Sequence, residues 1–411
     1  MDNLTHSLAG LAIAETALRL RPSKLRGPLY TASLLANNFP DLDSAYASFL
    51  SKPLGYVLHH RGHTHTFLSL IPQALLILLA MFAYSRFRKQ KWERGDWMQI
   101  ALLTCLGIAV HIALDSLNSY GVHPFWPWNN SWYSFDAVFI LEPAMWLSLA
   151  PPLALAAPGK WRKAVYWGLF LAALGLVWGV SFVPLTMKII YTLLAVGFVA
   201  SALYFDATQR IIISICYCLI LASSLVIISQ AVGGAIRANA EQGNPEWTVE
   251  DVVRTPDPAN PLCWNIIVIG STSPPNADYW VKEGRFRLPL VPRDSEICEH
   301  DPFSDKSAQV KALPLFPAGE LSGIIWRHEF RRPLKELQDL ARSSCHFGAF
   351  LQFARAPFWH RDGDKLYFGD LRYDRDASRG FSEFETLPTM PCPGNLPGWK
   401  SQIHSLLQVT D

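Results

Sequence analysis

The chain has 411 residues, of which 50% are hydrophobic and 17% are charged, and its mean hydropathy is +0.14. This composition excludes an ordinary soluble globular domain and indicates a membrane protein with a soluble part. The formal net charge is +2 and the Lys and Arg residues are scattered over short loops, so no nucleic-acid partner is expected.

Two short apolar segments open the chain, at about 4–18 and 28–39, with a basic stretch between them. They predict a short helical hairpin. Because the basic residues follow the first apolar run instead of preceding it, the segment lacks the pattern of a cleaved signal peptide.

Six later apolar stretches have the length that spans a bilayer, about 17 to 25 residues. They run near 67–85, 98–117, 138–157, 164–183, 188–205 and 210–231. From about residue 238 onward Pro, Asp and Asn become frequent and the apolar runs shrink to strand length. The predicted fold is therefore an α-helical polytopic membrane domain, residues 1–237, followed by a soluble α+β domain, residues 238–411. In the soluble domain we expect strands near 264–270, 286–291 and 366–372 and a short helix near 334–342.

Lys and Arg in short connections stay on the cytoplasmic side of a membrane. The loops after the first and third predicted spans are basic, at 86–94 and 160–163, and both are therefore expected to face the cytoplasm. This orientation places the segments 59–66 and 116–138 and the C-terminal domain outside. The expected location is the bacterial cytoplasmic (inner) membrane, with the lipid bilayer as the main partner.

Ionisable side chains gather on that outer side. His111 and Asp115 are four residues apart and share one helix face, while a run of imidazoles precedes the first span and a Pro-led turn carries two carboxylates. We expect them to converge on a metal ion. The candidate metal ligands are His6, Asp41, Asp43, His60, His65, His111 and Asp115.

Nitrogen and oxygen ligands without a thiolate suit zinc, manganese or iron(II). A divalent ion of this kind lowers the pKa of bound water and favours hydrolysis. Arg61 is then placed to bind a phosphate or carboxylate of the substrate. A free carboxylate among Asp41, Asp43 and Asp136 is expected to act as the general base, and the sequence does not choose between them.

Each of these groups also has an ordinary structural explanation. An intramembrane His or Asp can satisfy a neighbouring helix, an Asp can cap the helix that follows it, and Arg61 can pair with a lipid headgroup. The aromatic-rich loop at 120–135 either forms an interfacial belt or lines an apolar entrance for an amphipathic substrate.

Four motifs stand out within residues 1–145. They are Thr5-His6-Ser7 with Gly10, Phe39-Pro40-Asp41-Leu42-Asp43, His60-Arg61-Gly62-x-Thr64-His65, and His111-x-x-x-Asp115-x-x-Asn118-Ser119-Tyr120-Gly121. Together they resemble the YdjM-like family of predicted inner-membrane metal-dependent hydrolases, as do Asp136 with Phe139-Ile140. Pro258-x-x-Pro261-Leu262-x-Trp264 and Gly369-Asp370-Leu371-Arg372 are similar to segments of its longer members.

The resemblance implies that zinc is the preferred metal and that the reaction is phosphoester hydrolysis, because that family is distantly similar to zinc-dependent phospholipase C and S1/P1-type nucleases. Two departures limit it. His63 stands where the family carries an apolar residue, and no second His-x-x-x-Glu pair follows Asp115; His123, Asp136 and Glu142 are loose substitutes. One or two ions are therefore expected, not three.

Four of the seven cysteines, Cys263, Cys298, Cys345 and Cys392, lie in the C-terminal domain. In an extracytoplasmic domain they allow two disulfides with three possible connectivities. Their spacing fits no zinc-ribbon pattern.

Two hypotheses of different classes remain. The first is a hydrolase acting on a phosphoester or lipid-like small molecule at the outer face of the membrane, with Asp43, Arg61 and Asp136 as catalytic candidates. The second is a non-enzymatic scaffold or sensor in which metal holds helices together. Transport is less favoured, because the later spans are nearly free of polar residues.

Overall fold

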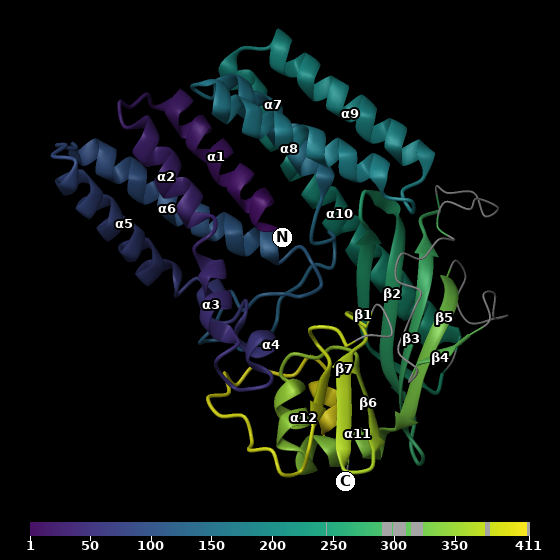
Figure 1. The fold of residues 1–411 in the computed structure, drawn as a ribbon. Coiled ribbons are helices and arrows are strands. Elements are labelled where there is room, and N and C mark those ends of the chain that lie inside the picture. The colour runs from purple at the N-terminus through teal and green to yellow at the C-terminus, as the bar shows by residue number, and fades with distance from the viewer. Residues whose placement is uncertain (244, 290–297, 299–309, 314–323, 375–378, 409–411) are drawn as a thin grey trace.

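A computed structural model describes residues 1–243, 245–289, 298, 310–313, 324–374 and 379–408. Figure 1 shows a bundle of helices at one end of the molecule, two sheets at the other, and one long helix that runs from the bundle alongside the larger sheet. The bundle contains α1 (Asn3–Leu20), α2 (Arg26–Ala36), α5 (Leu70–Phe87), α6 (Arg94–Asp115), α7 (Pro143–Ala156), α8 (Lys160–Gly179), α9 (Leu185–Tyr204) and α10 (Ala207–Gly243). Four short helical turns lie between α2 and α5: η1 (Pro40–Asp43), α3 (Ser44–Ala47), α4 (Gly55–His59) and η2 (His63–His65).

In the described part of the chain, four helices are long and apolar enough to cross a membrane: α5, α6, α9 and α10. The predicted N-terminal hairpin is confirmed as α1 and α2. The predicted spans near 138–157 and 164–183 correspond to α7 and α8, and the count of six spans is not confirmed. α7 has 14 residues, which gives a length of roughly 21 Å, less than the hydrocarbon core of a bilayer. It lies buried among α1, α8, α9 and α10.

The soluble part is built from two antiparallel sheets. The five-stranded sheet has the order β1-β2-β3-β5-β4, and the three-stranded sheet has the order β6-β7-β8. The strands are β1 (Trp247–Asp257), β2 (Asn260–Thr272), β3 (Asp278–Arg287), β4 (Lys311–Ala312), β5 (Ile324–Pro333), β6 (Pro357–Asp362), β7 (Lys365–Asp370) and β8 (Phe384–Thr386). Helices α11 (Leu334–Ser343) and α12 (Cys345–Phe350) and the turn η4 (His404–Leu407) complete it.

Most of the predicted elements of this domain are confirmed. The stretches 264–270 and 366–372 fall on β2 and β7, and 334–342 falls on α11. The strand expected at 286–291 is confirmed only at 286 and 287, because β3 starts earlier, at Asp278, and ends at Arg287; residues 290 and 291 lie outside the described residues. The predicted boundary at residue 237 falls inside α10, where Ala, Arg, Glu and Gln sustain the helix after its apolar run has ended.

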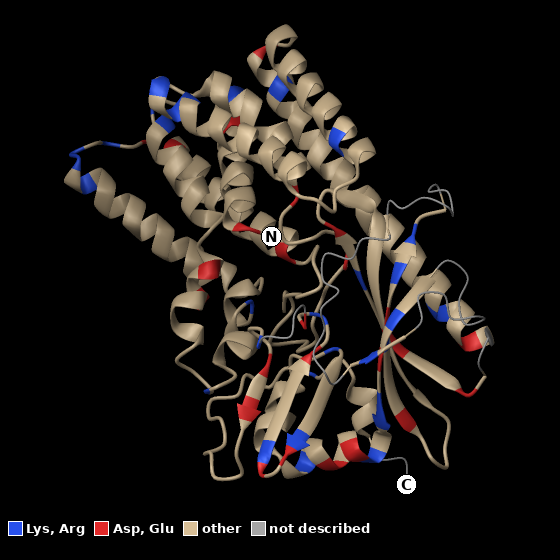
Figure 2. Cartoon of the chain, turned by 45° about the vertical axis from the view of Figure 1, so that its right-hand side comes forward, with Lys and Arg blue, Asp and Glu red and all other residues tan. Residues whose placement is uncertain are grey.

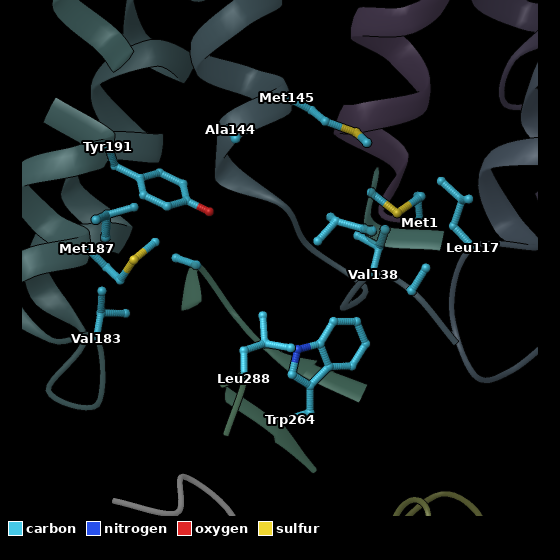
Figure 3. Close-up of a cluster of buried hydrophobic side chains, with 14 of the residues drawn as sticks. Met1, Leu117, Val138, Ala144, Met145, Val183, Met187, Tyr191, Trp264 and Leu288 are labelled. Carbon is cyan, nitrogen blue, oxygen red and sulfur yellow. The ribbon is translucent and has the colours of Figure 1, made fainter. Parts of the chain in front are cut away.

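The bundle and the larger sheet share one hydrophobic core. Figure 3 shows Trp264 and Leu288 of the sheet domain in the same apolar cluster as three residues of the helical part, Val138, Met187 and Tyr191. Trp264 is fully buried. Because large apolar surfaces of both parts are removed from water at this contact, the sheet domain packs on the bundle as part of one body instead of hanging from a linker.

An ionic cluster strengthens the same junction. Arg355 donates from Nη1 to Asp136 Oδ1 at 2.8 Å and from Nε to Asp251 Oδ2 at 2.7 Å, and Arg254 Nη2 lies 3.3 Å from Asp136 Oδ2. Asp136 and Arg355 are buried. Burial raises the pKa of Asp251, but attraction to Arg355 outweighs it and holds that pKa below its usual range. Gly233 of α10 leaves room for the Arg254 guanidinium, which a Cβ at this position would displace.

The basic loops collect at the opposite end of the bundle. Figure 2 shows Lys and Arg in the connections between helices, far from the sheets, with little charge along the helices between them. Helix ends meet there. Ser23 Oγ, in the loop after α1, lies 3.3 Å from Oδ1 of Asp96 in the first turn of α6, and Nη2 of Arg26 at the start of α2 donates to the carbonyl of Ala156 at the end of α7 at 2.9 Å. Lys and Arg thus mark one face of the bundle, as the predicted orientation requires.

The described cysteines of the soluble domain form two pairs, Cys263 with Cys298 and Cys345 with Cys392. Each pair joins elements distant in sequence, separated by 35 and 47 residues. Cys105, Cys216 and Cys218 are free.

The first prediction concerns the ionic cluster. We expect Arg355→Met to destabilise the protein by up to about 3–5 kcal/mol, because the buried Asp136 keeps only the more distant Arg254 and the partly buried Asp251 loses the Arg355 guanidinium. The exposed Arg331, which pairs with Asp278 at 2.7 Å, supplies the matched control: Arg331→Met should cost less than about 1 kcal/mol. The apparent Tm of each full-length variant in detergent measures this. Equal shifts for the two variants would contradict a stabilising role for the cluster.

A second prediction concerns the cysteines. If the soluble domain is extracytoplasmic, its four cysteines are oxidised in the cell, because structural disulfides persist in oxidising compartments. Maleimide should then label the three free cysteines of the denatured protein without reductant and all seven after reduction. Intact mass reports the number of labels. Seven labels without reductant would overturn the predicted orientation.

Candidate metal centre

Four short pieces of chain meet at the end of the bundle that faces the sheets. α1 brings His6, η1 brings Asp41 and Asp43, the segment from α4 to η2 brings His60, Arg61 and His65, and the last turn of α6 brings His111 and Asp115. Glycines let the helices approach so closely. A Cβ on Gly10 or Gly107 would lie within 3 Å of the Asn37 side chain, at the C-terminal end of α2. Pro40 begins η1, because its fixed φ suits the first position of a helical turn.

The closest group contains Asp41, His65, His111 and Asp115, whose ligand atoms all lie within 4.8 Å of one another. His65 Nε2 is 3.0 Å from His111 Nε2 and 3.1 Å from Asp115 Oδ2. Asp41 Oδ1 lies 3.5 Å from His65 Nε2 and 3.6 Å from His111 Nε2. Two imidazole nitrogens and two carboxylates from three separate elements thus face one point.

The outer hydrogen bonds of the two imidazoles direct their Nε2 atoms at this point. His111 Nδ1 is 2.8 Å from the carbonyl of Asn37, which can only accept, so the proton lies on Nδ1. His65 Nδ1 is 3.0 Å from Thr64 Oγ1, whose own proton goes to Asp43 Oδ2 at 2.6 Å. Both Nε2 lone pairs then face each other, an arrangement that needs a proton or a metal ion between them.

The electrostatics of His65 agree with this. Burial lowers the pKa of His65, but contacts with Asp115, Asp41 and Asp43 outweigh burial and raise the pKa to about 10. A site that holds a proton so firmly attracts a cation, and a bound metal would displace that proton. The donor set therefore fits a divalent metal ion, and its nitrogen and oxygen atoms suit zinc, manganese or iron(II).

His6 lies against the same group. Its Nε2 is 3.2 Å from Asp115 Oδ1 and its ring stacks on His111, with 3.9 Å between the ring centroids. The α-amino group of Met1 also contacts Asp115 Oδ1. Asp115 is thus shared, with Oδ2 facing His65 and Oδ1 facing His6.

Asp43 acts as an anchor for its neighbours. It accepts hydrogen bonds from His60 Nδ1 at 2.8 Å, from the Arg61 backbone N–H at 3.0 Å and from Thr64 Oγ1 at 2.6 Å. Burial raises its pKa, but the bonds from His60 and His65 hold that pKa well below the usual range. Asp41, Asp43 and His60 also form a second compact group with ligand atoms within 4.8 Å.

Arg61 is held beside this centre in an unusual backbone conformation, with φ at 58°. Such strained residues cluster at functional sites. Its Nη1 donates to Asn118 Oδ1 at 2.9 Å and its Nη2 lies 3.1 Å from Asp115 Oδ1. The guanidinium also lies over the Tyr120 ring, 5.2 Å from its centroid. Among the described residues, neither Arg61 Nε nor Asn118 Nδ2 has a hydrogen-bond partner although both are buried.

A cavity of about 630 Å³ opens beside the centre. Asp41, His60, Arg61 and Asn118 supply its polar wall. The other walls come from the N-terminal end of α1, the segment 138–140, and three residues of the soluble domain, Thr255, Tyr373 and Phe381. This volume is typical of a small-molecule site.

The soluble-domain residues of the cavity were not predicted. One signal was present, the Gly369-Asp370-Leu371-Arg372 segment. Arg372 donates from Nη1 to the carbonyl of Ser119 at 2.6 Å and from Nε to Asp370 Oδ2 at 2.9 Å. This pair anchors the chain that carries Tyr373 to the loop after α6.

The seven predicted ligands are thus brought together, as is Arg61. Asp136 is not: it lies in the ionic cluster with Arg355 and Arg254. Three further imidazoles also point elsewhere. His59 bonds Ser51 Oγ at 2.9 Å, His63 packs between Trp126 and Trp399, and His123 stacks on Trp399 with 3.7 Å between centroids.

A metal-content measurement tests the centre. We expect detergent-purified protein, after reconstitution with zinc or manganese, to retain one or two ions, and His65→Ala to lose them, because that imidazole is central to the closest group. The exposed His404, which contacts Gln408, is the control: His404→Ala should keep the metal. Elemental mass spectrometry gives the stoichiometry. Metal retained by both variants would remove His65 from the site.

Comparison with known proteins agrees with the motifs. The model of the YdjM inner membrane protein family matches residues 1–186. The uncharacterized protein YfhP of Bacillus subtilis (strain 168) is 22% identical over 180 residues, which are 43% of this chain and 52% of that protein, so the match spans about half the length of the relative. No solved structure matches the chain, and the expected similarity to phospholipase C is not confirmed. Residues 1–186, which contain the whole candidate metal centre, are therefore similar to the YdjM inner membrane protein family, as their motifs had suggested.

Proposed function

We propose that the protein is a membrane-bound, metal-dependent hydrolase that cleaves a phosphoester at the outer face of the cytoplasmic membrane. The observation that supports this proposal is that a candidate metal site and an anion-binding cavity lie side by side. A compact group of Asp41, His65, His111 and Asp115 lies beside a cavity of about 630 Å³, and a buried guanidinium with an unsatisfied amide neighbour lines that cavity.

The metal would be held by Asp41, His65, His111 and Asp115, with His6 beside them. When bound, a divalent ion supplies two effects, a lower pKa for water and polarisation of a phosphoryl oxygen. Zinc is the first candidate, since imidazole and carboxylate ligands together are its usual set. Manganese and iron(II) use the same ligands.

Arg61 and Asn118 would bind the substrate anion. Arg61 Nε and Asn118 Nδ2 are donors left unused by the protein, and buried donors normally find an acceptor. A phosphate oxygen in the cavity satisfies both. Because Arg61 is already paired with Asn118 and lies over Tyr120, its charge is fixed before the substrate arrives, which is how preorganised sites stabilise negative charge.

His60 is the better candidate for moving the proton. Three carboxylates were considered from the sequence. Asp41 belongs to the group that would hold the metal, Asp43 is occupied by three donors, and Asp136 lies in the ionic cluster. His60 lines the cavity and its Nδ1 is bound to Asp43 at 2.8 Å. A carboxylate so placed fixes the tautomer and leaves the other ring nitrogen to accept a proton.

The alternative is a scaffold in which metal merely joins helices. The observation in its favour is that the candidate ligands come from separate elements, so an ion would staple η1, η2 and α6 together. A staple needs no cavity, whereas this centre adjoins one that is lined by the soluble domain as well.

Hydrolysis of bis(p-nitrophenyl) phosphate by the metal-loaded protein tests the proposal. We expect turnover in the wild type and none above background in His111→Ala with Asp115→Ala, which loses the metal. Arg61→Gln should keep the metal but lower kcat/KM by roughly 10²–10³-fold, the loss seen when one preorganised donor is removed. Metal bound at full stoichiometry with no turnover of any phosphoester would favour the scaffold.

A further inference from the structure

A second cavity lies along the N-terminal helix. It is a groove of about 470 Å³ between the hairpin α1–α2 and helices α7 and α8, and Figure 1 shows α1 at the centre of this arrangement. Its walls are mostly aliphatic, with side chains from all four helices. They include Leu4, Leu8, Leu11, Leu34, Leu153 and Leu169.

The groove begins beside the cavity of the metal centre. Asn3 lines that cavity and donates to Asp41 Oδ2 at 3.0 Å. Leu4 and Ser7 line the groove, and Ser7 Oγ donates to the carbonyl of Asn3 at 2.7 Å. Asn3 and Ser7 are four residues apart and so lie on one face of α1. The cavity and the groove are therefore lined by consecutive residues, Asn3 and Leu4, of the first turn of this helix.

The other end of the groove is polar. Arg162 lines it, and close by Arg26 donates to Glu15 Oε2 and to the carbonyl of Ala156, both at 2.9 Å. From Leu4 to Leu11, the part of α1 that lines the groove, the helix axis rises roughly 10 Å. A mostly aliphatic groove that begins beside an anion-binding cavity suits an amphipathic molecule whose charged end lies in the cavity and whose chain lies along the groove.

The surroundings restrict the occupant further. α1 packs against α10 and α6, which are two of the candidate spans, so the groove lies at the depth of lipid chains. Water there would wet leucines, whereas an alkyl chain keeps them dry at a gain of about 25 cal/mol per Å².

We propose that the substrate is a phosphate-bearing lipid whose phosphate binds beside Arg61 and Asn118 and whose alkyl chain lies in the groove. The position of the phosphate rests on the proposed function. The groove supplies the rest: it selects esters with a long chain over soluble esters with the same leaving group.

Two substrates test the selection, p-nitrophenyl dodecyl phosphate and p-nitrophenyl methyl phosphate. In each, water adds to phosphorus, the bond to the nitrophenyl oxygen breaks, and p-nitrophenol and the alkyl phosphate are released. Gly27 lines the groove and no heavy atom lies within 4 Å of a Cβ built on it, so Gly27→Phe fills space without displacing the backbone. Gly175 of α8 has equally open surroundings but does not line the groove, and Gly175→Phe is the matched control.

We expect the ratio of kcat/KM for the dodecyl ester to that for the methyl ester to fall at least about tenfold in Gly27→Phe, the loss that exclusion of two buried methylenes gives. In Gly175→Phe, measured in the same detergent, the ratio should equal that of the wild type. An equal ratio in all three proteins would overturn the role of the groove and leave the hydrolase proposal standing.

Binding separates the two proposals if neither ester is cleaved. Native mass spectrometry with dodecyl phosphate, against methyl phosphate as the short-chain reference, measures occupancy without turnover. Dodecyl phosphate retained by the wild type and by Gly175→Phe, and lost from Gly27→Phe, supports the groove. Equal retention in the two variants, or none in the wild type, refutes it.

Discussion

Three carboxylates lie buried or nearly buried where α1, η1, η2 and the end of α6 meet: Asp41, Asp43 and Asp115. The arrangement of the site follows from the need to pair their negative charges with hydrogen-bond donors and cations. Each buried charge costs several kcal/mol unless it is paired and hydrogen-bonded. Asp115 has the most partners: His6, His65, His111, Arg61 and the α-amino group of Met1. Asp43 is satisfied by three donors of the His60–Thr64 segment. The imidazoles can therefore not turn away without leaving a charge unpaired, which fixes their orientation toward a common point.

The soluble domain belongs to the site by the same logic. Two arginines from its β6–β7 region reach the bundle: Arg355 closes on Asp136, and Arg372 bonds the carbonyl of Ser119. Both arginines are buried and charged. Separating the domain from the bundle would therefore expose the apolar core and also leave these arginines without their partners. This contact holds Tyr373 and Phe381 over the cavity. The domain is consequently a wall of the cavity, not a separate module that happens to share the chain.

The local parts of this arrangement could be predicted from the sequence. The four-residue spacing of His111 and Asp115 fixes their common face, and the motif at 60–65 together with the Pro-led turn marks the remaining candidates. The structure brings all of them to one place. What spacing cannot convey is the division of roles, because a carboxylate that anchors an imidazole and one that binds metal look alike in sequence. Asp43 shows this, since three hydrogen bonds make it an anchor.

Contacts between residues far apart in the chain also could not be predicted from the sequence. Asp136 follows the aromatic loop and precedes a segment that does line the cavity, yet its positive φ of 52° goes with a side chain that meets Arg355, more than two hundred residues away. Thr255, Tyr373 and Phe381 reach the cavity across similar distances in sequence. The span near 138–157 is not confirmed for a related reason: α7 is apolar and lies buried in protein, and composition cannot distinguish protein from lipid as its surroundings.

α1 shows how one short helix can join these functions. Three of its faces have different neighbours within two turns: His6 points to Asp115, Thr5 accepts from Trp146 Nε1 at 2.8 Å, and Asn3 and Ser7 lie on the face shared by the cavity and the groove. Gly10 lets α2 approach so closely that Ser33 Oγ donates to its carbonyl at 2.7 Å. These contacts fix the rotation of the helix about its axis. The metal centre and the groove therefore both depend on how this one helix is packed.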